Sequence, residues 1–455
     1  MMGGPFRWRN SPLRNAVESR AAHASRSRRN MEVLMPPKKS SLVNHWIRTI
    51  AFLLTSAAAL PGFAQTFSII HRFTGNAGAG NPAFQFVQDA AGNLYGTTSW
   101  GGAVRSCEGS GCGGVYRLSP NGNGGWTYTE LYNFQFGAEP YNLILDSAGN
   151  LYGTSAAGGP SGAGLVFELS PTTTGPWTFT TLYAFSGGSD GSLPNGYLVF
   201  DAEGNLYGTT AYGGNSENLG TVFELSPQAG GGWTEQVLWD FNFTSNAGYN
   251  PSAGVVFDAQ GNLYGTTSGD QAIGTYGTIY KLTKGASGWE ATLLHEFKGS
   301  GDGGIPEAPV AIDAAGNLYG TTIIGGNAQG SSGTGTVYEL SPNGSGGYAF
   351  GVLHDFGKTG QSYYPVVLDS SGNLIGVADG GRTNPPGFVF KLTHSGTSWS
   401  YSVLHGFDGT NGFQPNTVMI DPSGNIYGVT NAGGIAGCAN DSGCGTIFEI
   451  AAGAN

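Results

Sequence analysis

Short apolar runs alternate with polar turns along most of the chain, and no stretch after residue 65 has the period of a long amphipathic helix. Residues 196–201 form an apolar run that ends in Asp. Residues 205–210, 220–227 and 233–241 carry β-branched and aromatic side chains at alternate positions. This pattern predicts four β-strands joined by tight turns, in which Asp, Asn and Gly tolerate left-handed geometry.

The same unit recurs seven times. Each copy holds an Asp, two variable residues and Gly-Asn-(Leu/Ile)-(Tyr/Ile)-Gly, and successive copies begin 52 to 57 residues apart. A period this regular indicates one repeat body rather than two or three domains. Four antiparallel strands per repeat predict an all-β, seven-bladed β-propeller. The repeat Asp residues are Asp89, Asp146, Asp201, Asp258, Asp313, Asp369 and Asp421.

The two ends of the repeat body complement each other. Residues 66–73 resemble the fourth strand of the other copies, and residues 445–450 resemble the third. The last copy therefore lacks a fourth strand that the N-terminal end can supply. We predict that residues 65–455 form a single propeller domain whose N-terminal strand joins the last blade, which removes exposed sheet edges.

The first 64 residues have a different composition, with ten of the nineteen Lys and Arg but two of the thirty Asp and Glu. Basic residues precede an apolar run over residues 49–60, and small residues follow up to Ala64. This arrangement is typical of a secretory signal peptide. We predict cleavage after Ala64 and a secreted, periplasmic or cell-envelope protein. A retained signal anchor is the alternative, although the run is shorter than the roughly 20 residues of a spanning helix.

Removing residues 1–64 leaves 9 Lys and Arg against 28 Asp and Glu, a net charge of -19. Such a surface repels nucleic acid and anionic lipid, so we expect neither as a principal partner. We also expect no membrane insertion of the mature chain and a monomeric state.

The repeat carries further recurring units, which in the third copy are residues 205–210, Gly213-Gly214 and residues 220–227. With their counterparts over residues 66–450 they resemble the GloVer tandem repeat of exported bacterial "choice-of-anchor" proteins. The resemblance implies a tandem-repeat body in an exported protein. It implies no biochemical activity for this chain.

Most side chains that could do chemistry occupy repeat positions. The seven repeat Asp residues suit a turn in which the carboxylate accepts a hydrogen bond from its own backbone. Four histidines share a fourth-strand position with aromatic residues of other copies, which favours packing on a half-buried strand. The chain therefore has little material for a nucleophilic triad, and we predict no catalytic residue, metal site or cofactor. These histidines are His71, His295, His354 and His405, and their counterparts are Tyr132, Tyr183 and Trp239.

Four cysteines, Cys107, Cys112, Cys438 and Cys444, form two close pairs in the first and last copies. An even number in an exported chain predicts disulfides, and zinc binding by all four is the alternative. Each pair lies between the second and third strands of its blade. The first and last blades are neighbours in the closed ring, where the two ends of the repeat body meet. Three connectivities are open, and two of them would tie the first blade to the last.

Loop lengths distinguish the two faces of the predicted ring. The turns between the first and second strands and between the third and fourth hardly vary, whereas the second-to-third connection and the link between blades do. Alternating strand direction places both variable connections on one face, where binding residues concentrate. We predict ligand-binding aromatic residues on this face: Trp100, Tyr141, Tyr212, Tyr249, Tyr276, Tyr363, Tyr364 and Phe413.

Aromatic rings beside amides and hydroxyls suit sugar or peptide surfaces, and filling of gaps between blades is the alternative role. Acids on the same face could supply a catalytic pair, although no spacing singles one out. We predict a non-catalytic propeller that binds a glycan or an extracellular or envelope protein through the variable face. The alternative is a polysaccharide lyase or glycoside hydrolase with acids at the mouth of the central channel. The acids include Glu139, Asp190, Glu217, Asp270, Asp302, Glu307, Asp379, Asp408 and Asp441.

Overall fold

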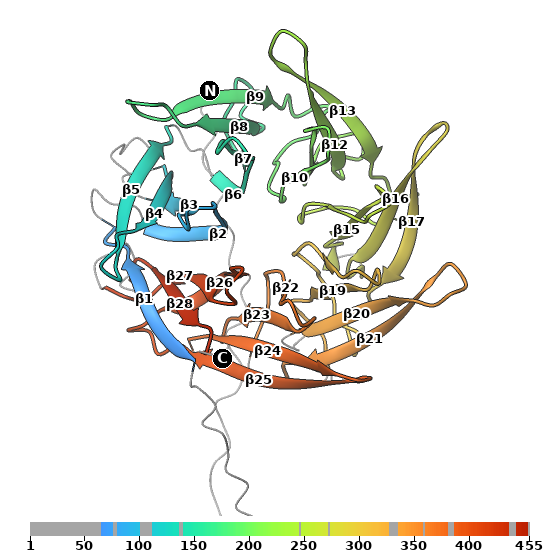
Figure 1. Cartoon of the computed structure of the whole chain (residues 1–455). Helices are drawn as coiled ribbons and strands as arrows, with labels where there is room; N and C mark the ends of the chain where they lie inside the picture. The colour runs from blue at the N-terminus through green and yellow to red at the C-terminus, as the bar shows by residue number, and fades with distance from the viewer. Residues whose placement is uncertain are drawn as a thin grey trace, which may run out of the picture. The chain divides into compact units, whose positions relative to one another are not determined.

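The structure is a computed structural model that describes residues 65–75, 80–100, 112–135, 140–244, 247–271, 274–326, 335–357, 360–380, 386–435 and 443–453. They form seven four-stranded antiparallel sheets arranged in a ring (Figure 1), within the compact unit Leu60–Asn455. The predicted all-β, seven-bladed propeller is confirmed. Within the described ranges, no helix has the length and apolarity needed to cross a bilayer. The predicted signal peptide over residues 1–64 lies outside the described residues.

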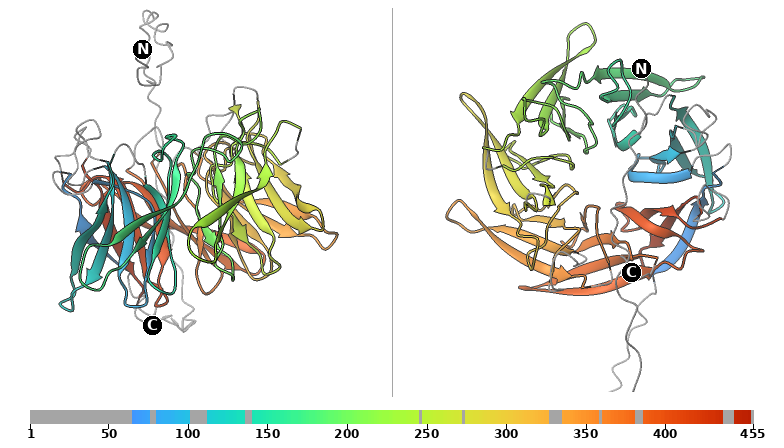
Figure 2. Two further views of the ribbon diagram at one scale, coloured as in Figure 1. Left: turned by 90° about the horizontal axis from the view of Figure 1, so that it is seen from above. Right: turned by 180° about the vertical axis from the view of Figure 1, so that it is seen from behind.

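Each blade runs outward from an inner strand beside the channel to an outer strand, as the rear view in Figure 2 shows, and in blades 3 to 6 the inner strand has only two residues. Blades 1 to 6 are, from inner to outer strand: β2 (Gly80–Gln88), β3 (Leu94–Trp100), β4 (Gly114–Pro120), β5 (Trp126–Asn133); β6 (Pro140–Leu145), β7 (Leu151–Ser155), β8 (Leu165–Ser170), β9 (Thr178–Ala184); β10 (Val199–Phe200), β11 (Leu206–Thr210), β12 (Thr221–Pro227), β13 (Trp233–Asp240); β14 (Val256–Phe257), β15 (Leu263–Thr267), β16 (Thr278–Gly285), β17 (Gly288–Glu296); β18 (Ala311–Ile312), β19 (Leu318–Thr321), β20 (Thr336–Pro342), β21 (Tyr348–Asp355); β22 (Val367–Leu368), β23 (Leu374–Ala378), β24 (Phe388–Ser395), β25 (Ser398–Gly406).

Blade 7 takes its strands from both ends of the ring. Its inner three strands are β26 (Phe413–Ile420), β27 (Ile426–Ala432) and β28 (Thr446–Ala451). Its outer strand is β1 (Thr66–Arg72), which pairs antiparallel with β28 and places Phe67 opposite Ile450.

A β-bulge recurs in every outer strand. In blade 3, Val222 pairs with Trp239 but Phe223 pairs with Val237, so Leu238 is the extra residue. The outer pairs of the other six blades shift register at the same place. The bulge bends the strand and turns this extra Leu or Ile toward the blade core, a break in the two-residue alternation that the sequence pattern did not predict.

Each repeat Asp closes its own turn, as predicted. In blade 3, Oδ1 of Asp201 accepts the backbone N–H of Glu203 at 3.0 Å and of Asn205 at 2.8 Å, and Oδ2 accepts the Tyr207 hydroxyl at 3.0 Å. The backbone bonds recur in the other six blades. In blade 6, Ile375 replaces the Tyr, and Lys391 Nζ binds Asp369 Oδ2 at 2.9 Å instead. The structural role of these carboxylates is confirmed.

The fourth-strand histidines have the predicted packing role, and the structure adds that each ring packs against the next blade. The rings of His295 and Phe350 in the next blade stack with centroids 3.9 Å apart. His71, His354 and His405 stack on Tyr128, Tyr401 and Phe67 in the same way. Burial lowers the pKa of all four rings, to about 4 for His71, so they stay neutral at physiological pH.

Neighbouring blades also meet where a glycine precedes the third strand. A Cβ on Gly277 would lie 2.7 Å from Cδ of Pro306, which begins the inner segment of the next blade. A Cβ on Gly220 would lie 2.7 Å from Pro251 Cδ, and both glycines have positive φ, 91° and 97°. Only glycine combines this backbone conformation with so close an approach.

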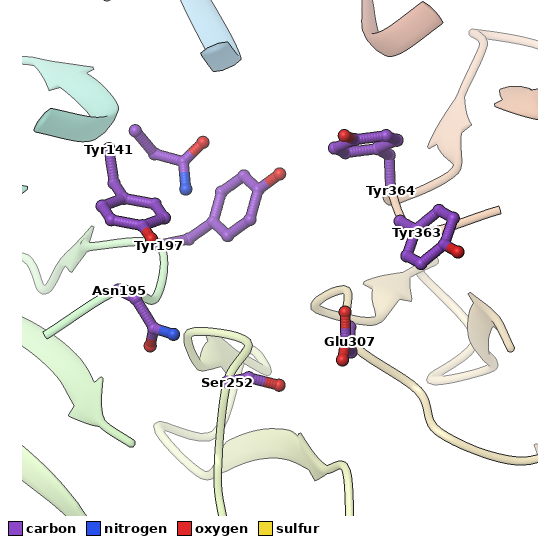
Figure 3. A pocket seen from close by; sticks show the side chains of 8 residues that line it. Tyr141, Asn195, Tyr197, Ser252, Glu307, Tyr363 and Tyr364 are labelled. Atoms are coloured by element: carbon purple, nitrogen blue, oxygen red, sulfur yellow. The ribbon is translucent and has the colours of Figure 1, made fainter. Parts of the chain in front are cut away.

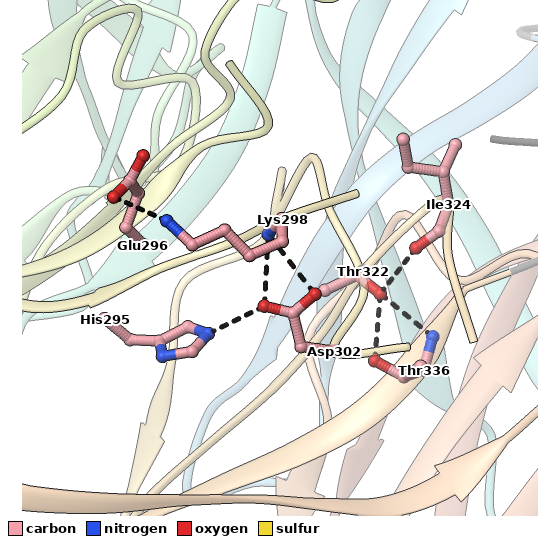
Figure 4. A network of polar contacts seen from close by, with 7 residues as sticks. All are labelled: His295, Glu296, Lys298, Asp302, Thr322, Ile324 and Thr336. Atoms are coloured by element: carbon pink, nitrogen blue, oxygen red, sulfur yellow. Dashed lines mark hydrogen bonds and ion pairs between the residues drawn. The ribbon is translucent and has the colours of Figure 1, made fainter. Parts of the chain in front are cut away.

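The loops that link blades are held by their own acids. Asp302 accepts the backbone N–H of Lys298 at 3.1 and 3.2 Å (Figure 4). Its Oδ2 also lies 3.3 Å from Nε2 of the His295 ring. In the loop between blades 2 and 3, Asp190 likewise accepts the backbone N–H of Ser186 at 2.7 Å. These two candidate catalytic acids therefore serve loop structure.

Candidate functional site

The inner segment of each blade consists of the residues that lead up to its repeat Asp, and it starts on the variable face. Its first residues therefore surround that end of the central channel. Four of them occupy one repeat position, six residues before the repeat Asp of blades 3 to 6. They line a cavity of about 240 Å³ together with residues four or five positions before the repeat Asp in blades 2, 3 and 6. We call this cavity the channel mouth. Its lining residues are Tyr141, Asn142, Asn195, Tyr197, Ser252, Glu307, Tyr363 and Tyr364.

A buried apolar residue holds each of these segments in place. Three residues before the repeat Asp stand Leu198, Val255 and Val310, all buried in blade cores. The side chains that line the cavity belong to residues four to six positions before the repeat Asp, just ahead of this buried position. The variation between polar and apolar residues is therefore concentrated at the start of the segment, where it meets the cavity.

Two tyrosines dominate the cavity. Figure 3 shows Tyr197 and Tyr364 pointing toward one another from opposite sides, with Glu307, Asn195 and Ser252 around them. Burial raises the pKa of both hydroxyls, so they remain neutral phenols that can donate and accept hydrogen bonds. A hydrogen bond with Asn431 of blade 7 counters part of the rise at Tyr364.

Three polar side chains of the channel mouth have an atom without a protein partner. These atoms are Asn142 Nδ2, Asn195 Oδ1 and Ser252 Oγ. The other amide atom of Asn142 is used, since its Oδ1 accepts the Gln85 backbone N–H at 2.9 Å. A buried polar group without a partner costs free energy that water or a ligand can offset. The channel mouth therefore holds hydrogen-bonding capacity that the fold itself does not use.

Glu307 is the one carboxylate among the described lining residues, and none of these residues is basic. The Glu307 side chain is exposed to the solvent of the channel, but the surrounding blades exclude part of the water around it. This desolvation raises the pKa of its carboxyl. A second candidate acid, Asp379, is not among these lining residues, but it and Glu307 both act electrostatically on the Tyr364 hydroxyl.

The eight predicted aromatic residues separate into groups. Tyr141, Tyr363 and Tyr364 line the channel mouth, whereas Tyr249 and Tyr276 line a second cavity of about 270 Å³. Tyr212, which is 45% exposed, and Phe413 at the start of β26 line neither cavity. Trp100 ends β3, and its side chain lies outside the described part of the structure.

The disulfides among the four cysteines stay a prediction. Cys112 and Cys444 are both buried beside blade cores. Cys107 and Cys438 lie outside the described residues.

Sequence reasoning missed four lining residues, Asn142, Asn195, Tyr197 and Ser252. It looked for aromatic residues in loops of unequal length, and these four belong to the inner segments instead. An alignment of the seven copies on the repeat Asp contains the missing signal. The position six residues before that Asp holds Ala, Pro, Asn, Ser, Glu, Tyr and Pro in turn, while the position three before is always apolar.

The fold and the repeat-lined channel define a tandem-repeat β-propeller. Residues 59–274 match the family model described as the Gloeobacter/Verrucomicrobia repeat. The predicted resemblance to the GloVer tandem repeat is confirmed for this part of the chain.

Solved structures share the architecture at low sequence identity. A streptogramin B lyase is 13% identical with a TM-score of 0.51, covering 84% of this chain and 97% of that one. PorZ, a bacterial surface component of the type-IX secretion system of Porphyromonas gingivalis, is 13% identical with a TM-score of 0.48, covering 82% and 47%. The Niastella koreensis GH74 enzyme is 16% identical with a TM-score of 0.47, covering 81% and 53%. These likenesses concern the fold alone, and no curated protein matches the sequence.

Proposed function

We propose that the protein is an exported, non-catalytic binding module that holds a neutral glycan in the channel mouth. One observation carries the proposal: four tyrosines and three polar groups with unused hydrogen-bonding atoms surround one cavity. Aromatic faces stack on the C–H face of a sugar ring, while sugar hydroxyls both donate and accept. A glycan would thus offset the cost of the unpartnered atoms, which an apolar ligand would not.

The charge of the site favours a neutral glycan over an anionic one. Glu307 contributes the one formal charge among the described lining residues. The mature chain as a whole, Glu307 included, has a net charge of -19. An anionic sugar would meet repulsion from Glu307 and from the rest of the chain, with no Lys or Arg in the lining to compensate.

The small number of acids in the lining favours binding over catalysis. Glycoside hydrolases generally use two carboxyl groups roughly 5 to 10 Å apart. Glu307 supplies one, and the two acids of the blade-linking loops described above are engaged with backbone N–H groups. A lyase or hydrolase acting from Glu307 is the alternative, and it rests on the raised pKa of that carboxyl.

A glycan array followed by calorimetry with residues 65–455 tests the proposal. We expect binding of a neutral oligosaccharide, and we expect Tyr197→Ala and Tyr364→Ala each to weaken it about tenfold or more. Tyr212→Ala is the matched control, because this tyrosine is exposed but outside the cavity.

An array without any bound glycan would overturn the proposal, and so would unchanged affinity in both channel variants. Release of shortened products from a bound glycan, abolished by Glu307→Gln, would replace binding with catalysis.

A further inference from the structure

A second cavity lies beside β17, in blade 4. It is lined by the link that follows β13, by the connection between β15 and β16, and by the end of β17. Its volume is about 270 Å³, and its apolar walls are Phe243, Tyr249, Tyr276 and Leu293. We call this cavity the rim hollow.

The rim hollow presents apolar surface to solvent. Phe243 is 59% exposed and Leu293 37%. The Phe243 ring meets the Tyr249 ring edge-on, with centroids 5.4 Å apart. The backbone N–H of Phe243 donates a hydrogen bond to Glu217 Oε2 at 2.6 Å. This charge-assisted bond keeps the exposed Phe243 ring in position. Phe243 is thus an exposed ring fixed against Tyr249, which is buried.

The polar groups of the rim hollow are already engaged with one another. The Tyr249 hydroxyl bonds the Thr275 hydroxyl, which also accepts the Asp270 N–H at 2.7 Å. Deeper in, Thr278 Oγ1 donates to the Ala247 carbonyl at 2.6 Å. A sugar would find few hydrogen-bonding groups free here, whereas an apolar side chain needs only surface to cover.

We infer that the rim hollow binds an apolar side chain, of leucine or phenylalanine type, from an extended basic segment of a partner protein. The site is separate from the channel mouth and does not depend on glycan binding there. An extended peptide suits the position, because β17 is the outer strand of its sheet and its far edge faces no other strand of that sheet. Backbone groups on such an edge can pair with an added strand.

The charge around the rim hollow supports a basic partner. Glu217 and Glu296 are both exposed, and Glu296 pairs with Lys298 at 2.7 Å (Figure 4). An exposed ion pair of this kind contributes little to stability, so a lysine or arginine of the partner can replace Lys298 at low cost. The net charge of -19 on the mature chain would attract such a segment from a distance.

Ligand-observed NMR with the mature protein tests the inference, with acetyl-Lys-Phe-Lys-amide as probe and acetyl-Lys-Ala-Lys-amide as its matched control. We expect saturation transfer to the Phe ring protons and a weak Kd that Phe243→Ala and Leu293→Ser each raise at least fivefold. Val403→Ser is the control variant. Val403 occupies the same register on β25, is 51% exposed and lies outside the cavity.

Equal binding of the two peptides would overturn the inference, and so would loss of binding in the Val403→Ser control as large as in Leu293→Ser. Binding of methyl glucoside that Phe243→Ala abolishes, without peptide binding, would assign the rim hollow to sugars instead. Glycan binding at the channel mouth is measured on the same variants, so failure of one proposal is distinguishable from failure of the other.

Discussion

The channel mouth and the rim hollow are similar in volume but differ in what their polar groups do. At the channel mouth, amide and hydroxyl atoms of Asn142, Asn195 and Ser252 lack protein partners. At the rim hollow, the hydroxyls of Tyr249 and Thr275 bond each other, and the exposed surface is apolar. Unused hydrogen-bonding capacity favours a polar ligand, and uncovered apolar area favours an apolar one.

The two cavities also differ in how the repeat builds them. The channel mouth collects equivalent positions from five blades, so its chemistry is set by variation at a few repeat positions. The rim hollow depends on the connections around one blade, including Phe243 in a link between blades. A repeat scaffold can therefore carry a shared central site and a local peripheral one without a change of fold.

One close contact between neighbouring blades joins the two regions and gives the prediction with the largest effect. Gly277 lines the rim hollow, and a Cβ there would lie 2.2 Å from the Thr267 carbonyl oxygen and 2.7 Å from Cδ of Pro306, the residue before Glu307. We expect Gly277→Ala to lower the free energy of unfolding by about 3 kcal/mol or more, because the clash adds to the strain at φ 91°. Urea unfolding followed by circular dichroism measures this loss.

Gly261→Ala is the matched control in the same blade. Its φ is 80°, and no atom lies within 4 Å of an added Cβ. We expect it to lose only about 1 kcal/mol, from backbone strain alone. Equal losses in the two variants would show that the contact with Pro306 does not hold the blades together.

A second prediction tests the contrast between unused and engaged hydrogen bonds. Asn195→Leu removes an amide oxygen that has no protein partner, so we expect the free energy of unfolding to stay the same or rise by up to about 1 kcal/mol while glycan affinity falls about tenfold. Thr275→Val instead leaves the Tyr249 hydroxyl unpaired, so we expect a loss of about 1 kcal/mol in stability and less than a twofold change in peptide affinity. Thermal unfolding and calorimetry on both variants make the comparison. A stability loss in Asn195→Leu would mean that the amide has a structural partner such as ordered water.

The fold could be predicted from the sequence because every blade repeats the same local physics. The turn of Asp201 and its six counterparts needs the same Asp, Gly and Asn in each copy, and the packing position of His295 accepts His or an aromatic residue. The bulge at Leu238 escaped prediction because it breaks the two-residue alternation that identifies a strand. The bulge does leave a signal in the sequence, which is the adjacent pair of large side chains Leu238 and Trp239. In a regular strand these two neighbours would point to opposite faces, so they could not both pack into the same core.

The sites were harder to predict because they depend on distance between repeats. Aromatic content on the variable face found Tyr363 and Tyr364 at the channel mouth and Tyr249 and Tyr276 at the rim hollow. It could not tell that these pairs belong to separate cavities. Phe243 carries no periodic signal at all, since its exposure follows from how the link between blades folds over Glu217.

The smallest predicted effect is a pH dependence that belongs to the channel mouth alone. Burial already raises the pKa of Glu307, and a glycan over the carboxyl excludes more water, so the pKa rises further in the complex. A ligand that raises a pKa binds the protonated form more tightly. Glycan affinity is therefore highest below the pKa of the free protein, falls as the pH rises through that pKa, and levels off above the pKa of the complex. We expect a total change of about threefold, measured by calorimetry between pH 4 and pH 8. Glu307→Gln should keep the acid-limb affinity at every pH, and a slope that persists in this variant would assign the dependence to another group.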